Sequence, residues 1–449
     1  MKKTFWRDFD NIFFIGIGGI SMSGLAVYLK EKGFNVSGSD IAESERTAFL
    51  KRKGIRVFEG HRRENILGAQ IVVCNSAIKE DNPELCAARE AGLIIVGRAE
   101  LLDLVSRDCE NVVAIAGCHG KTTTTAMCAH VLENCAESLT AHIGGEDAEY
   151  GNMYIGGNRF FVTEACEYNG NFLKLRPDLA VVLNTDVDHM EYYKTEKNLL
   201  NAYLSFAENA RACIVCADDR ISSHCRADVT FGLSPQSDVS AEEIVGSGGR
   251  YSFRLRVSGE IFDRIRLNVY GKHNILNALA AAAVGVRYRF PIPMIKGGLE
   301  NFKGIKRRFE KIGKYNGALF VADYAHHPGE IAAALRTARE TAKGRLFVIF
   351  QPHTYSRTRL LFSEFVRVLE GVENLVIYRT YPAREFFDAA GSALTLSESL
   401  PNSLYVESVK ELSLWLRRSV GGGDTVLVLG AGDIYCAAKL ALKQLRSDL

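Results

Sequence analysis

The stretch Asn111-Val-Val-Ala-Ile-Ala-Gly-Cys-His-Gly-Lys-Thr-Thr123 decides the fold of this chain. Its apolar first half predicts a buried strand, its two glycines predict a tight turn, and the residues that follow, up to Leu132, predict a helix. A helix that begins at such a turn points backbone N–H groups at phosphate oxygens. Lys121 can neutralise phosphate charge, and the Thr122 hydroxyl can reach a Mg²⁺ ion. The stretch therefore predicts an α/β domain that binds a nucleotide.

The loop departs from the general phosphate-loop pattern at one position, because Ile115 stands where the pattern has its first glycine. A glycine-rich turn with an incidental lysine is the alternative. We favour phosphate binding, since Gly-Lys-Thr directly after a strand is uncommon in such turns. The residues expected to bind ATP in this loop are Gly117, Cys118, His119, Gly120, Lys121, Thr122 and Thr123.

Acidic and polar residues follow the next two apolar strands. Glu164-Ala-Cys-Glu167 comes after one strand, and Asn184-Thr-Asp-Val-Asp-His189 comes after the other. The carboxyl ends of parallel strands meet at one edge of a sheet, where ligands bind. Both groups are therefore expected beside the phosphate loop, where they offer oxygen and nitrogen ligands for Mg²⁺. Solvated turn residues are the alternative for either group taken alone.

A separate α/β pattern precedes this one. Residues 11–15 read as a buried strand that runs into Gly16-Ile-Gly-Gly-Ile-Ser-Met-Ser-Gly24, and residues 33–40 read as a second strand that ends at Asp40. Further strands are expected at 71–74 and 93–96. The glycine spacing is not G-x-G-x-x-G, yet Asp40 is placed to bind a ribose. A nicotinamide-dependent oxidoreductase is therefore an alternative function.

The remainder of the chain divides into two parts. Residues 229–269 alternate in polarity around Gly246-Ser-Gly-Gly249, which predicts antiparallel strands and hairpins, and an alanine-rich helix follows at 274–286. Later strands are expected at 318–322, 346–350, 375–378 and 425–429, with helices between them. The fold class is therefore α/β, with three consecutive domains. We expect a Rossmann-like domain at 1–108, a P-loop ATPase-like domain with extra antiparallel strands at 109–310, and a Rossmann-like domain at 311–449.

Composition excludes several classes of protein. The 449 residues contain 55 Lys and Arg against 53 Asp and Glu, and this balance argues against binding to nucleic acid or to an anionic membrane surface. No apolar run approaches the ~20 residues of a membrane-spanning helix, and the charged N-terminus lacks the apolar core of a signal peptide. Eleven scattered cysteines do not suggest a secreted disulfide framework. A cytoplasmic monomer or homodimer is expected.

Taken together, the motifs resemble those of the Mur ligases of peptidoglycan synthesis. The shared motifs are Gly117–Thr123, Glu164, Asn184 with Asp188-His189, and Gly271-Lys-His-Asn274. Further motifs resemble the alanine-adding branch of the family, and they lie in order across nearly the whole chain: Gly16–Gly24, Lys306-Arg-Arg-Phe-Glu310, Asp323-Tyr-Ala-His-His-Pro328 and Gln351-Pro-His-Thr-Tyr-Ser-Arg357.

The resemblance implies a reaction, two cofactors and two substrates. ATP, assisted by Mg²⁺, would phosphorylate the lactyl carboxylate of UDP-N-acetylmuramate, and the amine of L-alanine would then attack the acyl phosphate. A carboxylate is a poor electrophile, and phosphorylation supplies its leaving group. Because two anions must meet, cationic groups and Mg²⁺ are needed to screen them.

Residue roles carry over from the family by position. Lys121, Glu164 and His189 would be catalytic, with Thr122 and Glu164 holding one Mg²⁺ and His189 a second. Asn274 would bind adenine, and a helix N-cap is its alternative role. Arg308 or Arg307 would contact the nucleotide phosphates, with a solvated linker as the alternative, and Asp323 would bind the ribose.

The resemblance also implies where the two substrates bind. The residues expected to hold the UDP moiety at the first glycine loop are Gly18, Gly19, Ser39, Asp40, Asn75 and Ser76. The residues expected to line the substrate and amino-acid side of the site are His326, His327, His353 and Arg357. A structural role is the alternative for each histidine. Thr354 stands where some alanine-adding enzymes carry arginine, which leaves more of the amino-acid carboxylate to Arg357. No lysine occurs in 202–206, where other branches carry a carbamylated lysine, and this fits the alanine-adding branch.

Two further alternatives stay open at this point. A murein-peptide-recycling ligase would join the same sugar nucleotide to a whole peptide, and a nucleotide-sensing partner protein would bind ATP without catalysis. Retention of Lys121, Thr122, Glu164 and His189 argues against the second. Cys118 lies beside Lys121 at a helix start, a position that favours the thiolate. We therefore expect a thiol reagent at Cys118 to block ATP binding.

Overall fold

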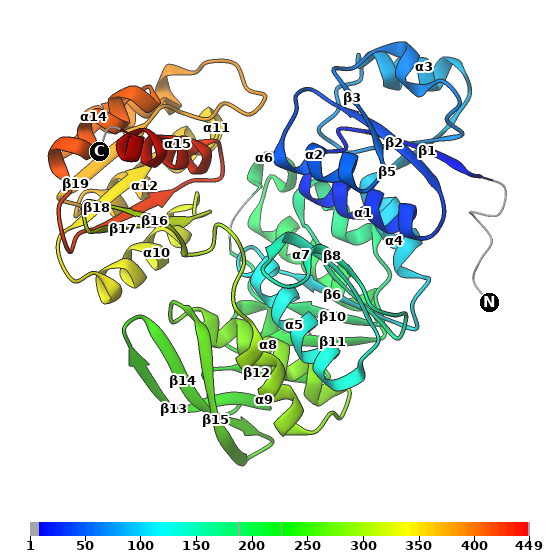
Figure 1. The fold of residues 1–449 in the computed structure, drawn as a ribbon. Coiled ribbons are helices and arrows are strands. Elements are labelled where there is room, and N and C mark those ends of the chain that lie inside the picture. Colours follow the sequence, from blue (N-terminus) through cyan, green and yellow to red (C-terminus); the bar gives the residue numbers. More distant parts are fainter. Residues whose placement is uncertain (1–8, 187–188, 226, 448–449) are drawn as a thin grey trace. The chain divides into compact units, whose positions relative to one another are not determined.

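The computed structural model describes residues 9–186, 189–225 and 227–447. Contacts divide the chain into two compact units. The first unit contains Met1–Ile244, Phe253–Arg266 and Ile275–Lys303, and the second contains Val245–Ser252, Leu267–Asn274 and Gly304–Leu449. Among the described residues, the strands form three sheets (Figure 1).

The N-terminal sheet has the strand order β3-β2-β1-β4-β5, and all of its pairs are parallel. Its strands are β1 (Asn11–Ile15), β2 (Asn35–Asp40), β3 (Arg56–Glu59), β4 (Ile71–Cys74) and β5 (Ile94–Gly97). Its connecting helices are α1 (Ile20–Glu31), α2 (Glu45–Arg52), α3 (Pro83–Glu90) and α4 (Arg98–Ser106). The expected strands are confirmed, and β3, with mixed polarity, was not predicted.

The central sheet is ordered β15-β14-β13-β12-β11-β10-β6-β9-β7-β8. Its strands are β6 (Asn111–Ala116), β7 (Leu139–Asp147), β8 (Gly151–Ile155), β9 (Phe160–Glu164), β10 (Leu179–Val182), β11 (Ala212–Cys216), β12 (Val229–Gly232), β13 (Val239–Ser247), β14 (Arg250–Val257) and β15 (Glu260–Tyr270). β6 lies between β9 and β10, parallel to both. The phosphate loop therefore begins in the middle of the sheet.

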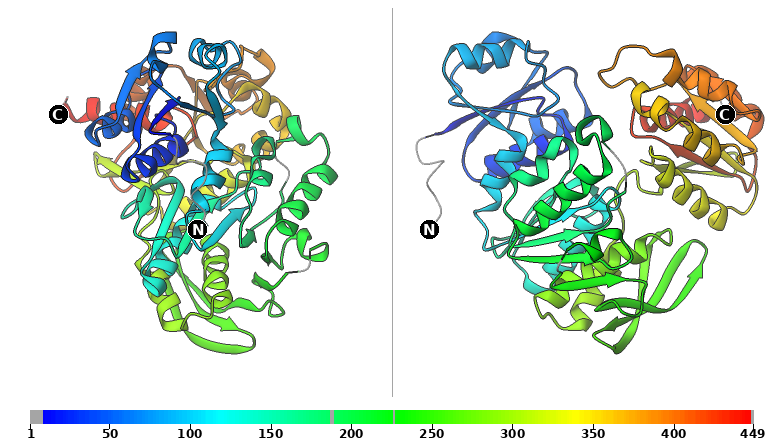
Figure 2. Two further views of the ribbon diagram at one scale, coloured as in Figure 1. Left: turned by 90° about the vertical axis from the view of Figure 1, so that its right-hand side faces the viewer. Right: turned by 180° about the vertical axis from the view of Figure 1, so that it is seen from behind.

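Helices cover both faces of this sheet. They are α5 (Lys121–Ala136), α6 (Met190–Tyr193), α7 (Glu196–Glu208), α8 (Asn274–Arg287) and α9 (Ile292–Asn301). α5 lies over the face seen in Figure 1, and α7 lies over the opposite face, seen from behind in the right-hand view of Figure 2. The prediction of antiparallel strands from residue 229 was wrong for β12, which is parallel to β11 and to β13. The β7–β8 hairpin was not predicted.

One apolar core joins the N-terminal sheet to the central sheet. Leu25 and Leu29 of α1 belong to the same buried cluster as Phe161 of β9 and Phe206 of α7. Asn152 of β8 also donates from Nδ2 to the Ile20 carbonyl, over 2.7 Å. These contacts place the N-terminal sheet and most of the central sheet in one compact unit, whereas the parts of β13, β14 and β15 within residues 245–252 and 267–270 belong to the other unit. The expected boundary near residue 108 stays a prediction.

The third sheet is ordered β16-β17-β21-β18-β19-β20, and only its first pair is antiparallel. Its strands are β16 (Glu310–Tyr315), β17 (Ala318–Asp323), β18 (Leu346–Phe350), β19 (Asn374–Tyr378), β20 (Ser403–Val406) and β21 (Thr425–Leu429). Its helices are α10 (Pro328–Thr341), α11 (Tyr355–Leu360), α12 (Phe362–Leu369), α13 (Ala393–Glu398), α14 (Val409–Ser419) and α15 (Ile434–Ser447). The four expected strands are confirmed.

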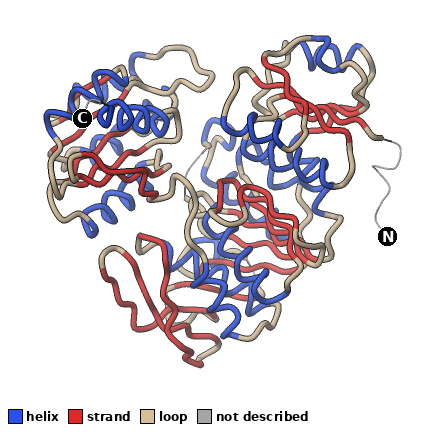
Figure 3. Tube along the Cα trace, in the orientation of Figure 1, coloured by secondary structure: helices blue, strands red, loops and turns tan. Residues whose placement is uncertain are grey.

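Side chains alternate between the two faces of this sheet, as the period of a strand requires. Leu427 and Leu429 of β21 pack in one buried cluster with α10, α12 and α13, while Val426 and Val428 pack in another with α14 and α15. Figure 3 shows these helices around the strands. Within the described residues, none of the helices combines the length and the hydropathy that a membrane crossing requires.

Candidate active site

The phosphate loop occupies the four residues between β6 and α5. Gly117 and Gly120 have φ values of +143° and +85°, which favour glycine. A Cβ atom on Gly117 would lie 2.9 Å from the Leu183 Cβ, and one on Gly120 would lie 2.5 Å from the Asn277 Oδ1. Both glycines are therefore required by backbone conformation and by space. Ile115 lies inside β6 and is buried, which explains the absence of a glycine at that position.

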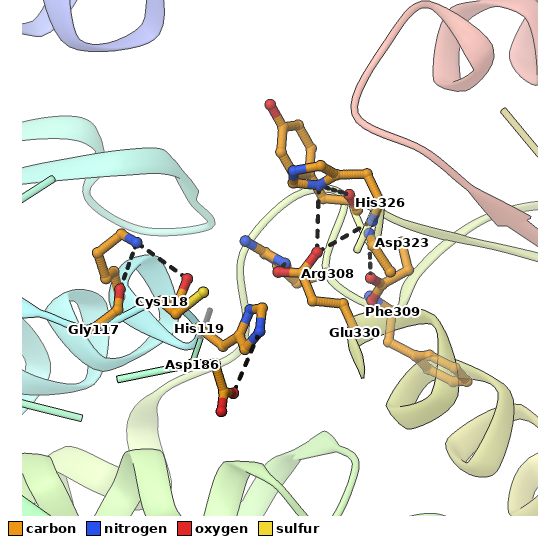
Figure 4. Close-up of polar contacts among 12 residues, drawn as sticks. Gly117, Cys118, His119, Asp186, Arg308, Phe309, Asp323, His326 and Glu330 are labelled. Carbon is orange, nitrogen blue, oxygen red and sulfur yellow. Dashed lines mark hydrogen bonds and ion pairs between the residues drawn. The ribbon is translucent and has the colours of Figure 1, made fainter. Parts of the chain in front are cut away.

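Lys121 is the first residue of α5, and its side chain folds back over the loop. Its Nζ donates to the carbonyls of Gly117, at 2.6 Å, and Cys118, at 3.2 Å (Figure 4). Nζ also lies 3.0 Å from Glu167 Oε1. Burial lowers the pKa of this ammonium, but the charge of Glu167 and the neighbouring thiols raise it, and the net pKa is raised. Lys121 is therefore a cation held at the loop.

Glu167 is the carboxylate partner of Lys121, and no role was predicted for it from the sequence. Glu164 of the same motif, predicted as a Mg²⁺ ligand, accepts with its Oε1 from the backbone N–H of Gly144 at 2.6 Å, and its role at the metal stays a prediction. Glu167 instead lies between Lys121 and His189, with 3.9 Å from its Oε1 to the His189 Nε2. A second carboxylate three residues after Glu164 was the available signal.

The segment after β10 closes over the phosphate loop. Asn184 accepts from the His119 N–H with Oδ1 at 2.9 Å, donates from Nδ2 to the His119 carbonyl at 3.0 Å, and accepts from the Cys118 N–H with its own carbonyl at 3.3 Å. His119 Nε2 is 3.6 Å from Asp186 Oδ2 (Figure 4). His189, with φ of +57°, directly precedes α6 as its N-cap residue. Asp188, part of the same predicted motif, lies outside the described residues.

The geometry fits a nucleotide with Mg²⁺. Cys118, His119 and Gly120 of the loop are half-buried, and so are Thr122 and Thr123 in the first turn of α5. Among the described side chains, no group of three His, Cys, Asp or Glu residues has metal-binding geometry by itself. Proteins usually hold Mg²⁺ through one or two carboxylates, with phosphate oxygens and waters as the other ligands. Glu164 offers one carboxylate and Thr122 a hydroxyl oxygen, so these two side chains have the donor chemistry for such a site, and their role in it stays a prediction.

The first glycine loop lies at the carboxyl edge of the N-terminal sheet. The Gly18 N–H donates to Asp40 Oδ2 at 2.7 Å, and a Cβ atom on Gly16 would lie 3.6 Å from Asn75 Nδ2. The structure thus places Asp40 and Asn75 against this glycine loop, and their binding of the UDP moiety stays a prediction. Gly19 precedes α1, and Ser76 is exposed at the end of β4.

Ser39 does not face solvent at this edge. It is fully buried, and its Oγ donates to Glu84 Oε2 at 2.6 Å and lies 3.0 Å from His61 Nδ1. His61 Nδ1 is in turn 2.8 Å from Glu84 Oε2. Ser39 thus holds the end of β2 through a buried polar cluster. The sequence offered no signal for Glu84 because it comes from the distant helix α3.

In the second unit, Asp323 ties two backbone segments together. It accepts from the Phe309 N–H at 2.8 Å and from the Ala325 N–H at 2.9 Å (Figure 4). Burial raises the pKa of its carboxyl, and the Arg308 charge opposes that rise. Arg308 Nη1 lies 3.8 Å from Glu330 Oε1.

Arg307 has a different environment from Arg308. Its Nη2 donates to the carbonyls of Gly430, at 2.9 Å, and Gly432, at 3.1 Å. Its guanidinium carbon lies 4.6 Å from the ring centre of Tyr324 and 5.4 Å from that of Tyr435. The Arg307 guanidinium is therefore bound by other groups of the protein, through two carbonyls and two aromatic rings.

Three of the four residues expected on the amino-acid side lie together. The rings of His326 and His353 are 5.6 Å apart, and Arg357 Nη1 lies 3.3 Å from His353 Nδ1. Burial lowers the pKa of His326 to about 4 and that of His353 to about 3. His327 is the residue before α10. Thr354, with φ of +67°, accepts from the Arg357 N–H as the cap of α11.

Asn274 is the first residue of α8. The alternative role as an N-cap would instead place Asn274 just before the helix, which would then begin at residue 275. It is buried, and its Nδ2 donates to the Tyr270 carbonyl at 2.7 Å. Burial lowers the pKa of the preceding His273 to about 4.

Family models match most of the chain in three consecutive segments. The Mur ligase family catalytic domain matches residues 11–108, the Mur ligase middle domain matches 115–285, and the Mur ligase glutamate ligase domain matches 307–432.

Curated proteins and solved structures resemble the chain along its whole length. A UDP-N-acetylmuramate–L-alanine ligase of Acetivibrio thermocellus is 41% identical, with 97% of this chain and 96% of that protein covered. One from Clostridium novyi is 40% identical, with 99% and 100% covered. The crystal structure of UDP-N-acetylmuramate-alanine ligase from Thermotoga maritima superposes with a TM-score of 0.85 at 31% identity, covering 98% of this chain and 100% of that one. A murein peptide ligase from Psychrobacter arcticus, 22% identical, shares the fold with a TM-score of 0.76, covering 97% and 98% of the two chains.

Proposed function

Because the chain belongs to the Mur ligase family, we propose that it joins the lactyl carboxylate of UDP-N-acetylmuramate to the amine of L-alanine at the expense of ATP. The observation that carries this proposal is identity of about 40% over nearly the full length of proteins named for that reaction. The product would be a precursor of peptidoglycan.

In the proposed mechanism, the ATP phosphates bind at the phosphate loop through the backbone N–H groups at the start of α5. Lys121 balances the negative charge that moves onto the bridging oxygen during transfer. The carboxylate attacks the γ-phosphorus, ADP leaves, and the alanine amine then attacks the acyl carbon and expels phosphate. A family member of the same fold, the Thermotoga maritima MurF ligase, is solved in complex with ADP, which supports nucleotide binding by this fold.

Mg²⁺, when bound, would screen the phosphate charge and polarise the phosphoryl group. Thr122 and Glu164 would hold one ion, and His189 a second. The His189 Nε2 lies 3.9 Å from Glu167, whose carboxylate also binds Lys121. Glu167 would therefore orient both groups that face the γ-phosphate.

The other assigned residues complete the proposal. Gly18, Gly19 and Asp40, with Asn75 and Ser76, would bind the UDP moiety, and Ser39 would hold the end of β2 behind them. Asn274, Arg308 and Asp323 would contact adenine, phosphate and ribose. Neutral His326 and His353, with His327 and Arg357, would receive the amino acid.

We propose domain boundaries at 1–108, 109–310 and 311–449, which the three matched segments support. We also propose a cytoplasmic location, because all eleven cysteines are free thiols, as expected in a reducing compartment, and ATP is the co-substrate.

Phosphate release tests the function. Purified protein is given ATP, Mg²⁺ and UDP-N-acetylmuramate, with L-alanine, with the tripeptide of the recycling reaction, or with neither. The proposal expects release that depends on alanine, and a product heavier by one alanine residue. Release with the tripeptide alone would assign the protein to recycling, and a folded protein silent in every reaction would reopen the nucleotide-sensing alternative.

A further inference from the structure

A pair of residues outside the predicted site holds the segment that closes over the phosphate loop. Asp219 and Arg220 follow β11 and start the short 3-10 helix η3 (Arg220–Ser223). Asp219 Oδ2 accepts from the Thr185 N–H at 3.0 Å, and its Oδ1 accepts from the Thr185 hydroxyl at 2.8 Å. Arg220 Nη2 donates to the Thr185 carbonyl at 2.7 Å. Two adjacent residues thus bind every polar group of Thr185.

Thr185 is buried, with 1% of its surface exposed, so none of these groups can turn to water instead. Asp219 Oδ1 also accepts from the Ile221 N–H at 3.0 Å, and Arg220 Nε donates to the Thr185 hydroxyl at 3.1 Å. The contact is therefore a network that includes a carboxylate and a guanidinium, and Arg220 Nη1 extends it to Glu196 Oε2 at 2.9 Å. Such charge-assisted bonds fix geometry more firmly than neutral ones.

The network is one residue away from the phosphate loop. Thr185 is bonded to Asn184 in the chain, and Asn184 makes three hydrogen bonds to the backbone of Cys118 and His119. The route from Asp219 to the loop passes only through Thr185 and Asn184. A displacement of Thr185 must move Asn184, and with it the backbone of Cys118 and His119 that Asn184 holds.

We propose that Asp219 and Arg220 are positioning residues that set the phosphate loop in its nucleotide-binding geometry, through Thr185 and Asn184. They touch neither nucleotide nor reacting atoms, and they act on affinity for the nucleotide. This role rests on the proposed nucleotide site, and it does not depend on which amine the enzyme uses.

Asp218 provides a matched control on the same turn. Its Oδ2 accepts from the Leu233 N–H at 2.6 Å, and its Oδ1 accepts from the Ser234 N–H at 3.3 Å. Like Asp219, it binds two backbone or side-chain donors of a neighbouring segment, but that segment follows β12 and does not touch the phosphate loop. Asp218→Asn therefore removes a similar charge from the same turn without loosening Thr185.

The test measures binding of Mg-ADP by calorimetry, together with the KM values for ATP and L-alanine. Asp219→Asn and Thr185→Val are each expected to weaken Mg-ADP binding about tenfold and to raise the KM for ATP, with the KM for L-alanine unchanged, because small displacements of a binding loop are costly. Thr185→Ser keeps the hydroxyl and should stay within about twofold of wild type. Asp218→Asn should bind Mg-ADP like wild type.

Wild-type Mg-ADP affinity in folded Asp219→Asn and Thr185→Val would overturn the proposal, and so would an equal loss in Asp218→Asn or in Thr185→Ser. If Asp219→Asn does not fold, the Thr185→Val and Thr185→Ser pair still decides. Wild-type protein that binds Mg-ADP but releases no phosphate would contradict the ligase function alone, and the positioning test would stand.

Discussion

Lys121 and Glu167 form an ion pair at the start of α5, with 2.9 Å between Nζ and Oε2. Only 16% of the lysine side chain and 3% of the glutamate side chain are exposed. Glu167, in the loop that follows β9, therefore already holds the lysine that a nucleotide needs. Phosphate oxygens would enter a site in which that ammonium is charged and oriented.

Glu167→Gln should lower both stability and turnover. Loss of the carboxylate leaves a buried ammonium with only carbonyl partners, and breaking a buried pair costs about 3 kcal/mol. The free energy of unfolding, from urea denaturation, and the rate of phosphate release measure the two effects. Glu43→Gln, at the exposed pair with Lys51, is the control and should change neither. Unaltered stability and turnover in Glu167→Gln would show that the pair has no role.

Gly120→Ala should abolish nucleotide binding. The new Cβ would meet the Asn277 Oδ1 at 2.5 Å, at a φ of +85° that alanine adopts with difficulty. Gly54→Ala is a matched control, because Gly54 has a φ of +75° and nothing within 4 Å of the added atom. The control should lose only the backbone term of about 1 kcal/mol. Equal Mg-ADP affinity in the two variants would mean that space at Gly120 is not limiting.

ATP should protect Cys118 from alkylation. The thiol lies in the phosphate loop and is half-buried, so bound phosphates would cover it. Iodoacetamide labelling followed by peptide mass spectrometry gives the rate at each cysteine, with and without Mg-ATP. The exposed Cys436 is the internal control, since nothing in the proposal covers it. Labelling of Cys118 at one rate in both conditions contradicts the site.

Substitution of Arg307 should affect stability, whereas substitution of Arg308 should affect nucleotide binding. Arg307→Lys loses the two carbonyl bonds and the contact with Tyr324, which a lysine cannot reproduce together, so the midpoint of thermal unfolding should fall while Mg-ADP affinity persists. Arg308→Lys should keep the midpoint and raise the KM for ATP about tenfold, as loss of a phosphate contact predicts. The reverse pattern would assign the phosphate contact to Arg307.

Stability should fall as the pH drops from about 6.5 to about 4. Burial lowers the pKa of His326 to about 4, whereas the unfolded chain has an ordinary histidine pKa near 6.5. Between these values the unfolded state binds the extra proton, so the free energy of unfolding decreases with falling pH, by up to about 1.4 kcal/mol per pH unit for each such histidine. Above pH 6.5 His326 is neutral in both the folded and the unfolded state, so it no longer makes the free energy of unfolding depend on pH.

His326→Gln should flatten this dependence, because glutamine does not titrate. Urea denaturation of both proteins at several values between pH 4 and pH 8 gives the slopes. His142, His273 and His353 have similarly lowered pKa values and should preserve part of the slope in the variant. Identical slopes in the two proteins would mean that His326 has the same pKa in the folded and the unfolded chain.

Local patterns were sufficient for much of the fold and part of the site. The strand, loop and helix around Lys121, and the strands ending at Asp40 and Glu164, follow from apolar periodicity and glycine position, and each involves residues close in sequence. The same patterns failed at β12 and at the β7–β8 hairpin. Strand direction and hairpin pairing depend on neighbours in the sheet that a single segment does not reveal.

The sequence by itself determined the fold class, the family and the phosphate loop, because these depend on residues a few positions apart whose spacing is fixed by strand and helix geometry. Only the tertiary structure decided that Glu167 pairs with Lys121, that Arg307 is committed to Gly430 and Gly432, and that Asp219 holds Thr185. Those contacts join residues 34 to 125 positions apart. Burial of Glu167 and Thr185 favours two of them, because their polar groups have no water to bind and must find partners in the folded chain.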